Sequence, residues 1–122
     1  MLPDNGEKNQ ELYQKAVKFF HNMAFKIEKE IILVGTSGKK HHFDLVVKTD
    51  SDLEIREILV KIVDWKRAVG VDRLIRFERV LNDLSDKKGM IIANCFSDSA
   101  VKFAKRCGLI IYERDHLQIP QD

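Results

Sequence analysis

The sequence predicts a single α/β domain over residues 1–122, with helices on both faces of one mixed β-sheet. Three strand patterns follow one another at short intervals, which predicts an antiparallel meander because short turns join antiparallel strands. Helical and buried-strand patterns then alternate, and strands joined in this way pair in parallel through right-handed crossovers. The expected order is therefore helix, three strands, helix, strand, helix, strand (αβββαβαβ).

The composition is that of a globular protein, since 44% of the residues are hydrophobic and 33% are charged. The 21 basic and 19 acidic side chains leave a formal charge of +2, so any nucleic-acid surface must be a local patch. The N-terminus shows no apolar signal region, and the longest apolar runs are far too short to span a bilayer. We therefore expect a cytoplasmic protein with no membrane segment.

The first two elements are predicted to be a helix over residues 7–23 and a strand over residues 25–34. In the strand, Phe25 and Ile27 alternate with charged residues, and residues 31–34 are wholly apolar. In the helix, apolar residues recur at the three- and four-residue spacings of one buried face. These residues are Leu12, Ala16, Phe19, Phe20 and Met23.

Two polar turns separate the remaining strands of the meander. Residues 35–40 contain two glycines, which supply the unusual backbone angles of a tight turn. The second strand covers residues 42–48, at hairpin distance from the first. After a turn over residues 49–52, the third strand covers residues 55–65, with a mostly apolar run at its centre.

The rest of the chain predicts two helices that alternate with two buried strands. A helix over residues 71–84 has its apolar residues on one side, and a short apolar run over residues 90–94 is typical of a strand buried on both faces. The next helix ends at Gly108. A last strand covers residues 109–112, and residues 117–119 are a candidate extension of it. The candidate N-caps of the helix that ends at Gly108 are Ser97 and Ser99.

Two stretches of the meander carry polar residues that could form a reactive site. One is Gly35-Thr-Ser-Gly-Lys-Lys-His-His-Phe-Asp44, and the other ends in Asp64-Trp-Lys66. The two-residue periodicity of a strand places His42 and Asp44 on one face. A carboxylate there, facing an acidic-x-Lys element on the third strand, would form a site for a hard divalent cation. In such a site the metal polarises a phosphodiester, and the lysine stabilises charge or orients the water.

Three further stretches accompany the one that ends at Asp44. They are Trp65-Lys-Arg-Ala-Val-Gly-Val71, Lys88-Gly-Met-Ile-Ile-Ala-Asn-Cys-Phe-Ser97 and Leu109-Ile-Ile-Tyr-Glu113. In this order and spacing, the four stretches resemble the Mrr-type and archaeal Holliday-junction-resolvase-like branch of the restriction-endonuclease-like, or PD-(D/E)xK, nuclease superfamily. The resemblance extends from about Glu11 to Glu113, and it implies a restriction-endonuclease-like core with metal-dependent nuclease activity.

The resemblance maps Asp44 onto the family's first metal-binding aspartate. It places Lys61 and Val63 where the family carries its acidic residue and its lysine, and neither can take those roles. One residue further along, the triplet from Asp64 to Lys66 has the correct internal spacing. Two alternatives follow: the active pair has moved to Asp64 and Lys66, or the site has decayed.

Strand parity bears on these alternatives. Lys61 and Val63 share one face of the third strand, whereas Asp64 and Lys66 share the other. If Lys61 and Val63 face Asp44, then Asp64 points away unless a β-bulge re-aims it. In that register the ammonium group of Lys61 would form an ion pair with Asp44 and repel Mg²⁺.

Several further side chains have both a functional and an ordinary interpretation. Glu11 could supply an additional metal-binding carboxylate, and Glu30 is a similar candidate, although such residues are more often solvated. His42 could shape the site or contact a phosphate, or it could flank a turn. A row of basic residues could grip a phosphate backbone, or could be a solvated face paired with acidic neighbours. The row comprises Lys66, Arg67, Arg73, Arg76 and Arg79.

The leading hypothesis is a metal-dependent DNA endonuclease of Mrr or resolvase-like type, which hydrolyses phosphodiester bonds in duplex or branched DNA. Its metal is Mg²⁺ or Mn²⁺, and a homodimer presents two active sites to two strands. The alternative is a catalytically degenerate nuclease-fold module that binds nucleic acid or a protein partner. In the leading hypothesis the catalytic residues are Asp44, Asp64 and Lys66, the metal ligands are Asp44, Asp64 and Glu11, and the DNA-binding residues are His42, Lys66, Arg67, Arg73 and Arg76.

Overall fold

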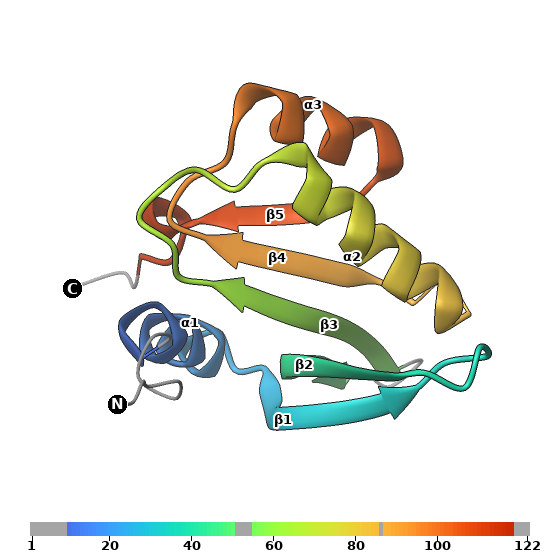
Figure 1. Ribbon diagram of the computed structural model, residues 1–122. Helices are drawn as coiled ribbons and strands as arrows, with labels where there is room; N and C mark the ends of the chain where they lie inside the picture. Colours follow the sequence, from blue (N-terminus) through green and yellow to red (C-terminus); the bar gives the residue numbers. More distant parts are fainter. Residues whose placement is uncertain (1–9, 51–54, 86, 119–122) are drawn as a thin grey trace, which may run out of the picture.

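The computed structural model describes residues 10–50, 55–85 and 87–118, which form a five-stranded mixed sheet flanked by helices (Figure 1). In chain order the elements are α1 (Gln10–Asn22), β1 (Lys26–Val34), β2 (Lys40–Asp50), β3 (Ile55–Val63), α2 (Val71–Asp83), β4 (Gly89–Ala93), α3 (Asp98–Cys107), β5 (Ile110–Glu113) and the 3₁₀ helix η1 (Arg114–His116). The strands lie in the order β1-β2-β3-β4-β5, with antiparallel pairing from β1 to β3 and parallel pairing from β3 to β5. The predicted fold class and element order are confirmed. Residues 7–9 of the expected first helix lie outside the described residues.

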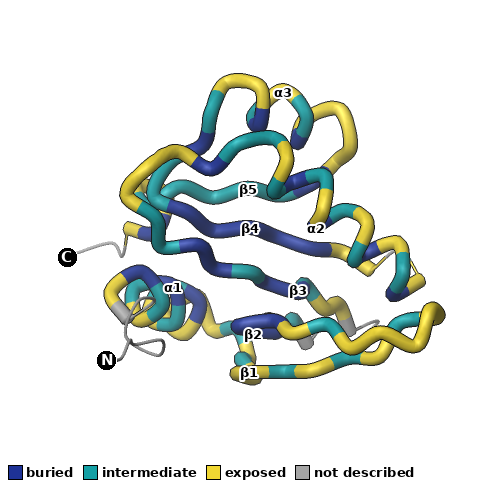
Figure 2. The backbone as a smooth tube through the Cα atoms, viewed as in Figure 1, coloured by how far each residue is buried: buried dark blue, intermediate teal, exposed yellow. Residues whose placement is uncertain are grey.

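Each face of the sheet has its own core of buried apolar side chains. Helices α2 and α3 cover one face, and α1 covers the other (Figure 1). Strand β4 is buried along its whole length because both layers pack against it (Figure 2). Within the described ranges, no helix has the length and apolar character needed to cross a membrane. The core under α2 and α3 includes Phe43, Leu59, Leu74, Phe77 and Ile91, and the core under α1 includes Leu12, Phe20, Leu45, Val60 and Ile92.

The ends of α3 follow from two residues that the sequence singles out. The hydroxyl of Ser97 accepts a hydrogen bond from the backbone amide of Ala100 at 3.2 Å, so Ser97 is the N-cap. Gly108 ends the helix in the left-handed conformation, with φ at 72°. Glycine adopts this conformation without steric cost, which explains why the helix stops there.

Several strand boundaries shift by one or two residues, since β2 covers Lys40–Asp50 and β3 ends at Val63, and two further differences change the surroundings of a side chain. Helix α1 ends at Asn22, and Met23 is 51% exposed instead of lying on the buried face. Ala24, which has a φ of 67°, takes the chain out of the helical path at this point. At the other end of the chain, η1 follows β5 directly, so Leu117 enters the core under α1 from a 3₁₀ turn rather than from an extended strand. Residue 119 lies outside the described residues.

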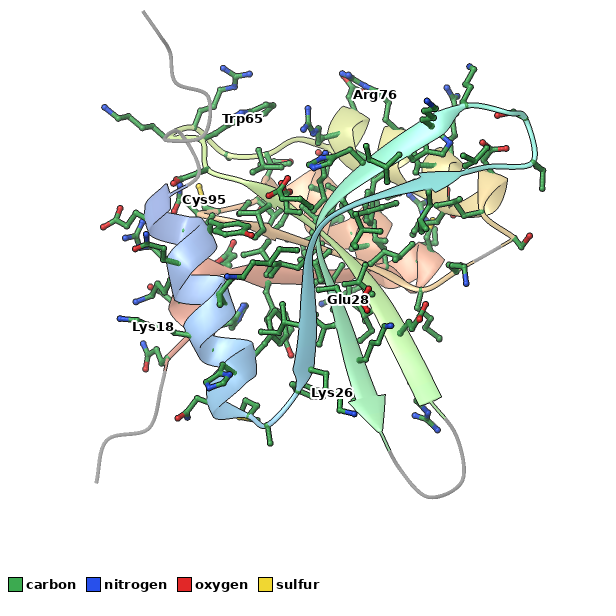
Figure 3. All side chains as sticks on the ribbon, turned by 90° about the horizontal axis from the view of Figure 1, so that it is seen from below. Lys18, Lys26, Glu28, Trp65, Arg76 and Cys95 are labelled. Atoms are coloured by element: carbon green, nitrogen blue, oxygen red, sulfur yellow. The ribbon has the colours of Figure 1, made fainter. Side chains whose placement is uncertain are left out.

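The β1–β2 hairpin twists at Glu30 on β1 and Asp44 on β2, so that its apolar side chains enter a different core on each side of this point. The two strands keep one antiparallel register throughout. Ile27 packs in the core under α1, whereas Ile31 and Phe43 pack in the core under α2 and α3. Residues four positions apart share a face of a flat strand, so the backbone must twist between Ile27 and Ile31. Glu30 has a left-handed φ of 54°, and Figure 3 shows the hairpin bending.

One carboxylate fastens the tip of this hairpin to the C-terminal end of α2. Asp83 accepts hydrogen bonds from the amide and the hydroxyl of Ser37, at 2.9 and 2.7 Å. It also accepts from the hydroxyl of Thr36 at 3.0 Å and from Nε2 of His41 at 2.8 Å. Gly35 passes so close that a Cβ on it would come within 2.0 Å of the Asp83 carboxylate. The anchor therefore fixes the far half of the hairpin, and with it the side chains at the bend.

The anchor predicts that the hairpin loosens in acid. The hydrogen bond from His41, followed by those from Ser37, holds the pKa of Asp83 well below its ordinary value. A carboxylate with a lowered pKa stabilises the fold fully above its unfolded pKa of about 4, and this contribution is lost as the pH falls below that value. We therefore expect Asp83→Asn to lower the Tm at about pH 7 but to differ much less from the wild type at about pH 2. Melting curves across this range measure the difference, and an equal gap at every pH would contradict the anchor.

Candidate functional site

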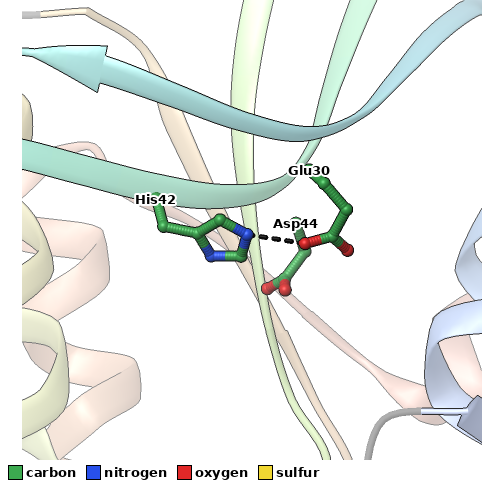
Figure 4. A group of neighbouring side chains, drawn as sticks. All are labelled: Glu30, His42 and Asp44. Carbon is green, nitrogen blue, oxygen red and sulfur yellow. Dashed lines mark hydrogen bonds and ion pairs between the residues drawn. The ribbon is translucent and has the colours of Figure 1, made fainter. Parts of the chain in front are cut away.

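Three side chains with metal-binding chemistry come together at the bend of the hairpin. Glu30 lies on β1, and His42 and Asp44 lie on β2 (Figure 4). Nε2 of His42 donates a hydrogen bond to Oε1 of Glu30 at 2.6 Å. One ligand atom from each of the three residues lies within 4.8 Å of the other two, and the described part of the chain holds no second group of this kind. An imidazole and two carboxylates at this spacing could bind a divalent cation.

Asp44 lies where β2 and β3 part. The ladder between these strands extends from Asp50 opposite Ile55 to Leu45 opposite Val60. Beyond that pair, Oδ2 of Asp44 accepts a hydrogen bond from the backbone amide of Ile62 at 2.7 Å. Asp44 is only 5% exposed, and it is the one buried charged residue in the described ranges. Its carboxylate is therefore held in a fixed place between the two strands.

Lys61 approaches the same region from β3. Its Nζ donates a hydrogen bond to the backbone carbonyl of His42 at 3.2 Å. The ion pair expected between Lys61 and Asp44 is not formed in the structure. The ammonium group is bound to the hairpin backbone, so it does not neutralise the Asp44 carboxylate directly.

Side chains from two helices respond to the charge at this site. Burial raises the pKa of Tyr13 on α1, and the charges of Glu30 and Asp44 raise it further. Burial and the charge of Arg76 lower the pKa of Arg73 on α2, while Asp44 acts in the opposite direction. The cluster therefore lies within electrostatic reach of both α1 and α2, on the two sides of the sheet.

Asp64 and Glu11, both predicted metal ligands, belong to a different network. Asp64 accepts hydrogen bonds from the backbone amide of Leu12 at 3.4 Å and from the side-chain amide of Asn94 at 2.8 Å. Arg114 donates a hydrogen bond to the side-chain Oδ1 of Asn94 at 3.1 Å and forms an ion pair with Glu11 at 2.9 Å. This network ties the start of α1 to the chain after β3 and β4. The structure does not bring Asp64 or Glu11 into the Asp44 cluster.

Two of the predicted DNA-binding residues, Arg67 and Arg73, lie over the ring of Trp65, which follows β3. The guanidinium carbon of Arg67 lies 4.2 Å from the centre of the Trp65 ring, and that of Arg73 lies 5.2 Å from it. Trp65 packs partly against the core under α2 and α3, as expected of a packing residue. Lys66, Arg67 and Arg76 are exposed, and Figure 3 shows Trp65 and Arg76 toward the same side of the molecule.

The sequence pattern names Glu30 as a candidate metal ligand but does not place it beside Asp44. The signal was present, because Glu30 and Asp44 each lie seven residues from Ser37 at the centre of the turn (37 − 30 = 44 − 37). A symmetrical hairpin brings such residues opposite each other. The backbone amide of Ile62 could not have been found in this way, because its bond to Asp44 requires the two strands to part.

Comparisons with known proteins give a consistent result for the fold. Residues 7–118 match the family model Mrr_cat, described as restriction endonuclease. The structure of AF1548, titled a protein of unknown function, matches with a TM-score of 0.70 at 16% identity, over 81% of this chain and 55% of that one. A search of curated proteins finds no match.

Two further matching structures are a repair endonuclease and a protein–DNA complex. A repair endonuclease from Pyrococcus abyssi has a TM-score of 0.53 and 13% identity, over 93% of this chain and 48% of that one. The chain in an EndoMS-dsDNA2 complex has a TM-score of 0.56 and 17% identity, over 100% of this chain and 48% of that one. The chain thus spans about half the length of each of these three structures. At these identities the likeness shows a shared fold.

Proposed function

We propose that this chain, which belongs to the restriction endonuclease family of the Mrr_cat model, is a metal-dependent endonuclease domain that hydrolyses phosphodiester bonds in DNA. The observation that carries the proposal is the position of Asp44. Its buried carboxylate is held by the Ile62 amide at the point where β2 and β3 part. The family resemblance maps this residue onto the first metal-binding aspartate of the family.

The residues at the site fit a divalent cation such as Mg²⁺ or Mn²⁺, because the Asp44 carboxylate is fixed and forms no ion pair with a basic side chain of the described residues. Such an ion, when bound, would polarise a phosphodiester and lower the pKa of its water. The exposed Lys66, Arg67 and Arg76 would bind phosphates of the DNA backbone. Arg73 would bind a phosphate closer to Asp44, and so would His42 if its imidazole is not itself a metal ligand.

The second half of the catalytic set has two candidate arrangements. In one, Asp64 and Lys66 join Asp44, with Glu11 as a further ligand. Both carboxylate oxygens of Asp64 already accept hydrogen bonds, so this arrangement requires the end of β3 to rearrange. In the other, the chain uses Lys61, which already lies beside the cluster.

The proposal is tested by incubating the full chain with supercoiled plasmid, linear duplex and a four-way junction. We expect cleavage of at least one of these DNA forms with Mg²⁺ or Mn²⁺, and none with EDTA. Cleavage that persists in EDTA, or no cleavage of any form with either ion, would contradict it. A homodimer, in which two sites face the two strands, belongs to the same proposal and is measured by light scattering on the protein.

A second candidate function is supported by one observation, the lysine at residue 61. A basic residue stands where the family carries an acidic one, which favours a nuclease fold that binds nucleic acid or a protein without cutting. Binding of duplex or junction DNA in a gel-shift assay, without cleavage under any metal condition, would favour this second candidate over the first.

A further inference from the structure

We infer that this chain holds its metal ion on the β1–β2 hairpin, through Glu30, His42 and Asp44, and that it binds Mn²⁺ more tightly than Mg²⁺. The inference rests on the proposed function only in placing the ion at the same aspartate. It differs from both arrangements above, because β1 rather than β3 supplies the second carboxylate.

The first support is the convergence of the three side chains. Their ligand atoms already lie within 4.8 Å of one another, and Nε2 of His42 lies 2.6 Å from Oε1 of Glu30 (Figure 4). Both side chains are partly exposed, whereas Asp44 is buried beneath them. A cation arriving from solvent would therefore meet Glu30 and His42 before it reaches Asp44.

The second support is independent of the cluster and concerns the Asp44 carboxylate itself. The Ile62 amide satisfies Oδ2, but no donor in the described part of the chain is bound to Oδ1. A buried carboxylate oxygen without a donor is costly, because burial removes the water that would otherwise solvate it. A cation shared with Glu30 and His42 would remove this cost.

The charge of the site is also suited to a cation. Lys61, the basic side chain that reaches the hairpin from β3, is bound to the carbonyl of His42 and forms no ion pair with either carboxylate. Burial raises the pKa of Tyr13 most, and the negative charges of Glu30 and Asp44 raise it further. A cation would replace the proton that Nε2 of His42 donates to Glu30, because a metal-binding imidazole nitrogen must be deprotonated.

The preference for Mn²⁺ follows from the nitrogen ligand. Mg²⁺ favours oxygen ligands in nearly ideal octahedral geometry, and it keeps several of its waters. Mg²⁺ also gives up its waters reluctantly, so replacing one of them with the His42 nitrogen should be less favourable for Mg²⁺ than for Mn²⁺. Replacing His42 with glutamine would restore an oxygen ligand and reduce that preference.

The test is calorimetric titration of the folded full chain with Mn²⁺ and with Mg²⁺, and it does not depend on cleavage. We expect Glu30→Gln and His42→Gln to weaken Mn²⁺ binding by about 10- to 100-fold or more, since even outer-shell substitutions cost that much. Glu28→Gln and His21→Gln are matched controls and should bind as the wild type does. Glu28 lies on the same strand but pairs with Lys48, and His21 lies at the exposed end of α1.

A spectroscopic measurement separates a ligand from a merely structural residue. Pulsed electron paramagnetic resonance of the Mn²⁺-loaded wild type should show coupling to an imidazole nitrogen, and His42→Gln should lose it. Retention of that coupling in His42→Gln would overturn the inference. So would Mn²⁺ binding that is unchanged in both Glu30→Gln and His42→Gln.

The outcomes for the metal site and for the endonuclease are distinguishable. Binding that depends on Asp44 and Asp64 but not on Glu30 would overturn the hairpin site and leave the proposed endonuclease intact. Binding that depends on Glu30 and His42, in a protein that cuts no DNA, would support the hairpin site and contradict the proposed endonuclease. A wild type that binds neither ion would overturn the inference.

Discussion

Replacing Asp44 with asparagine should abolish metal-dependent DNA cleavage while leaving the fold in place. The metal is worth several kcal/mol of transition-state stabilisation, and each 1.4 kcal/mol corresponds to about tenfold in rate, so we expect a loss of about three orders of magnitude or more. Asparagine keeps the shape of the side chain and an oxygen that can accept from the Ile62 amide. It lacks the negative charge that a cation requires. Initial rates of plasmid cleavage measure the effect.

Replacing Asp44 with alanine should also lower the stability of the fold, which the asparagine variant should not do. Asp44→Ala leaves the amide of Ile62 buried without an acceptor, which should cost about 1–3 kcal/mol of stability in addition to the loss of cleavage. Asp115→Asn, on exposed η1, is the matched control and should cleave like the wild type. If Asp44→Asn cleaves at the wild-type rate, the activity belongs to another site or to a contaminant.

The sheet could be predicted from the sequence because its information is local. Partial alternation, apolar runs and short turns specify the meander, and alternating helices and apolar runs specify the parallel half. The errors occur where tertiary packing overrides a local pattern. Met23 fits the apolar spacing of α1, but the chain turns at Ala24 before it can be buried. Leu117 looks like a strand residue, but it enters the core from η1.

The candidate site could be predicted only in part, because the hairpin bend is not visible in the strand pattern. Asp44 was recognisable from its position on the second strand. Strand parity predicts that Asp64 points away from a site that Lys61 faces, and the structure places Asp64 in the network with Leu12 and Asn94. The convergence of Glu30 with His42 depends on the register of two strands and on the twist between them. No single segment contains that information.

Replacing each lysine in turn tests whether Lys61 or Lys66 is the catalytic lysine. The two residues lie five positions apart (66 − 61) in one segment. The ammonium group of Lys61 is bound to the His42 carbonyl beside the cluster, whereas Lys66 is exposed and follows Trp65. An ammonium group beside the metal-binding cluster would stabilise the negative charge that develops on the reacting phosphate in the transition state. An exposed phosphate contact affects DNA binding more than it affects the chemical step.

Lys61→Met should therefore lower the single-turnover cleavage rate by about 10²- to 10³-fold, which is the usual cost of losing one such charge-stabilising group. Lys66→Met should change that rate by less than about tenfold and should mainly weaken DNA binding and its salt dependence. The two variants remove the same charge, so each is the control for the other. Single-turnover rates and DNA affinities, measured on both proteins at equal ionic strength, decide the matter. The reverse result, with cleavage lost in Lys66→Met and kept in Lys61→Met, would show that Asp64 and Lys66 form the active pair and that the end of β3 rearranges when DNA or metal binds.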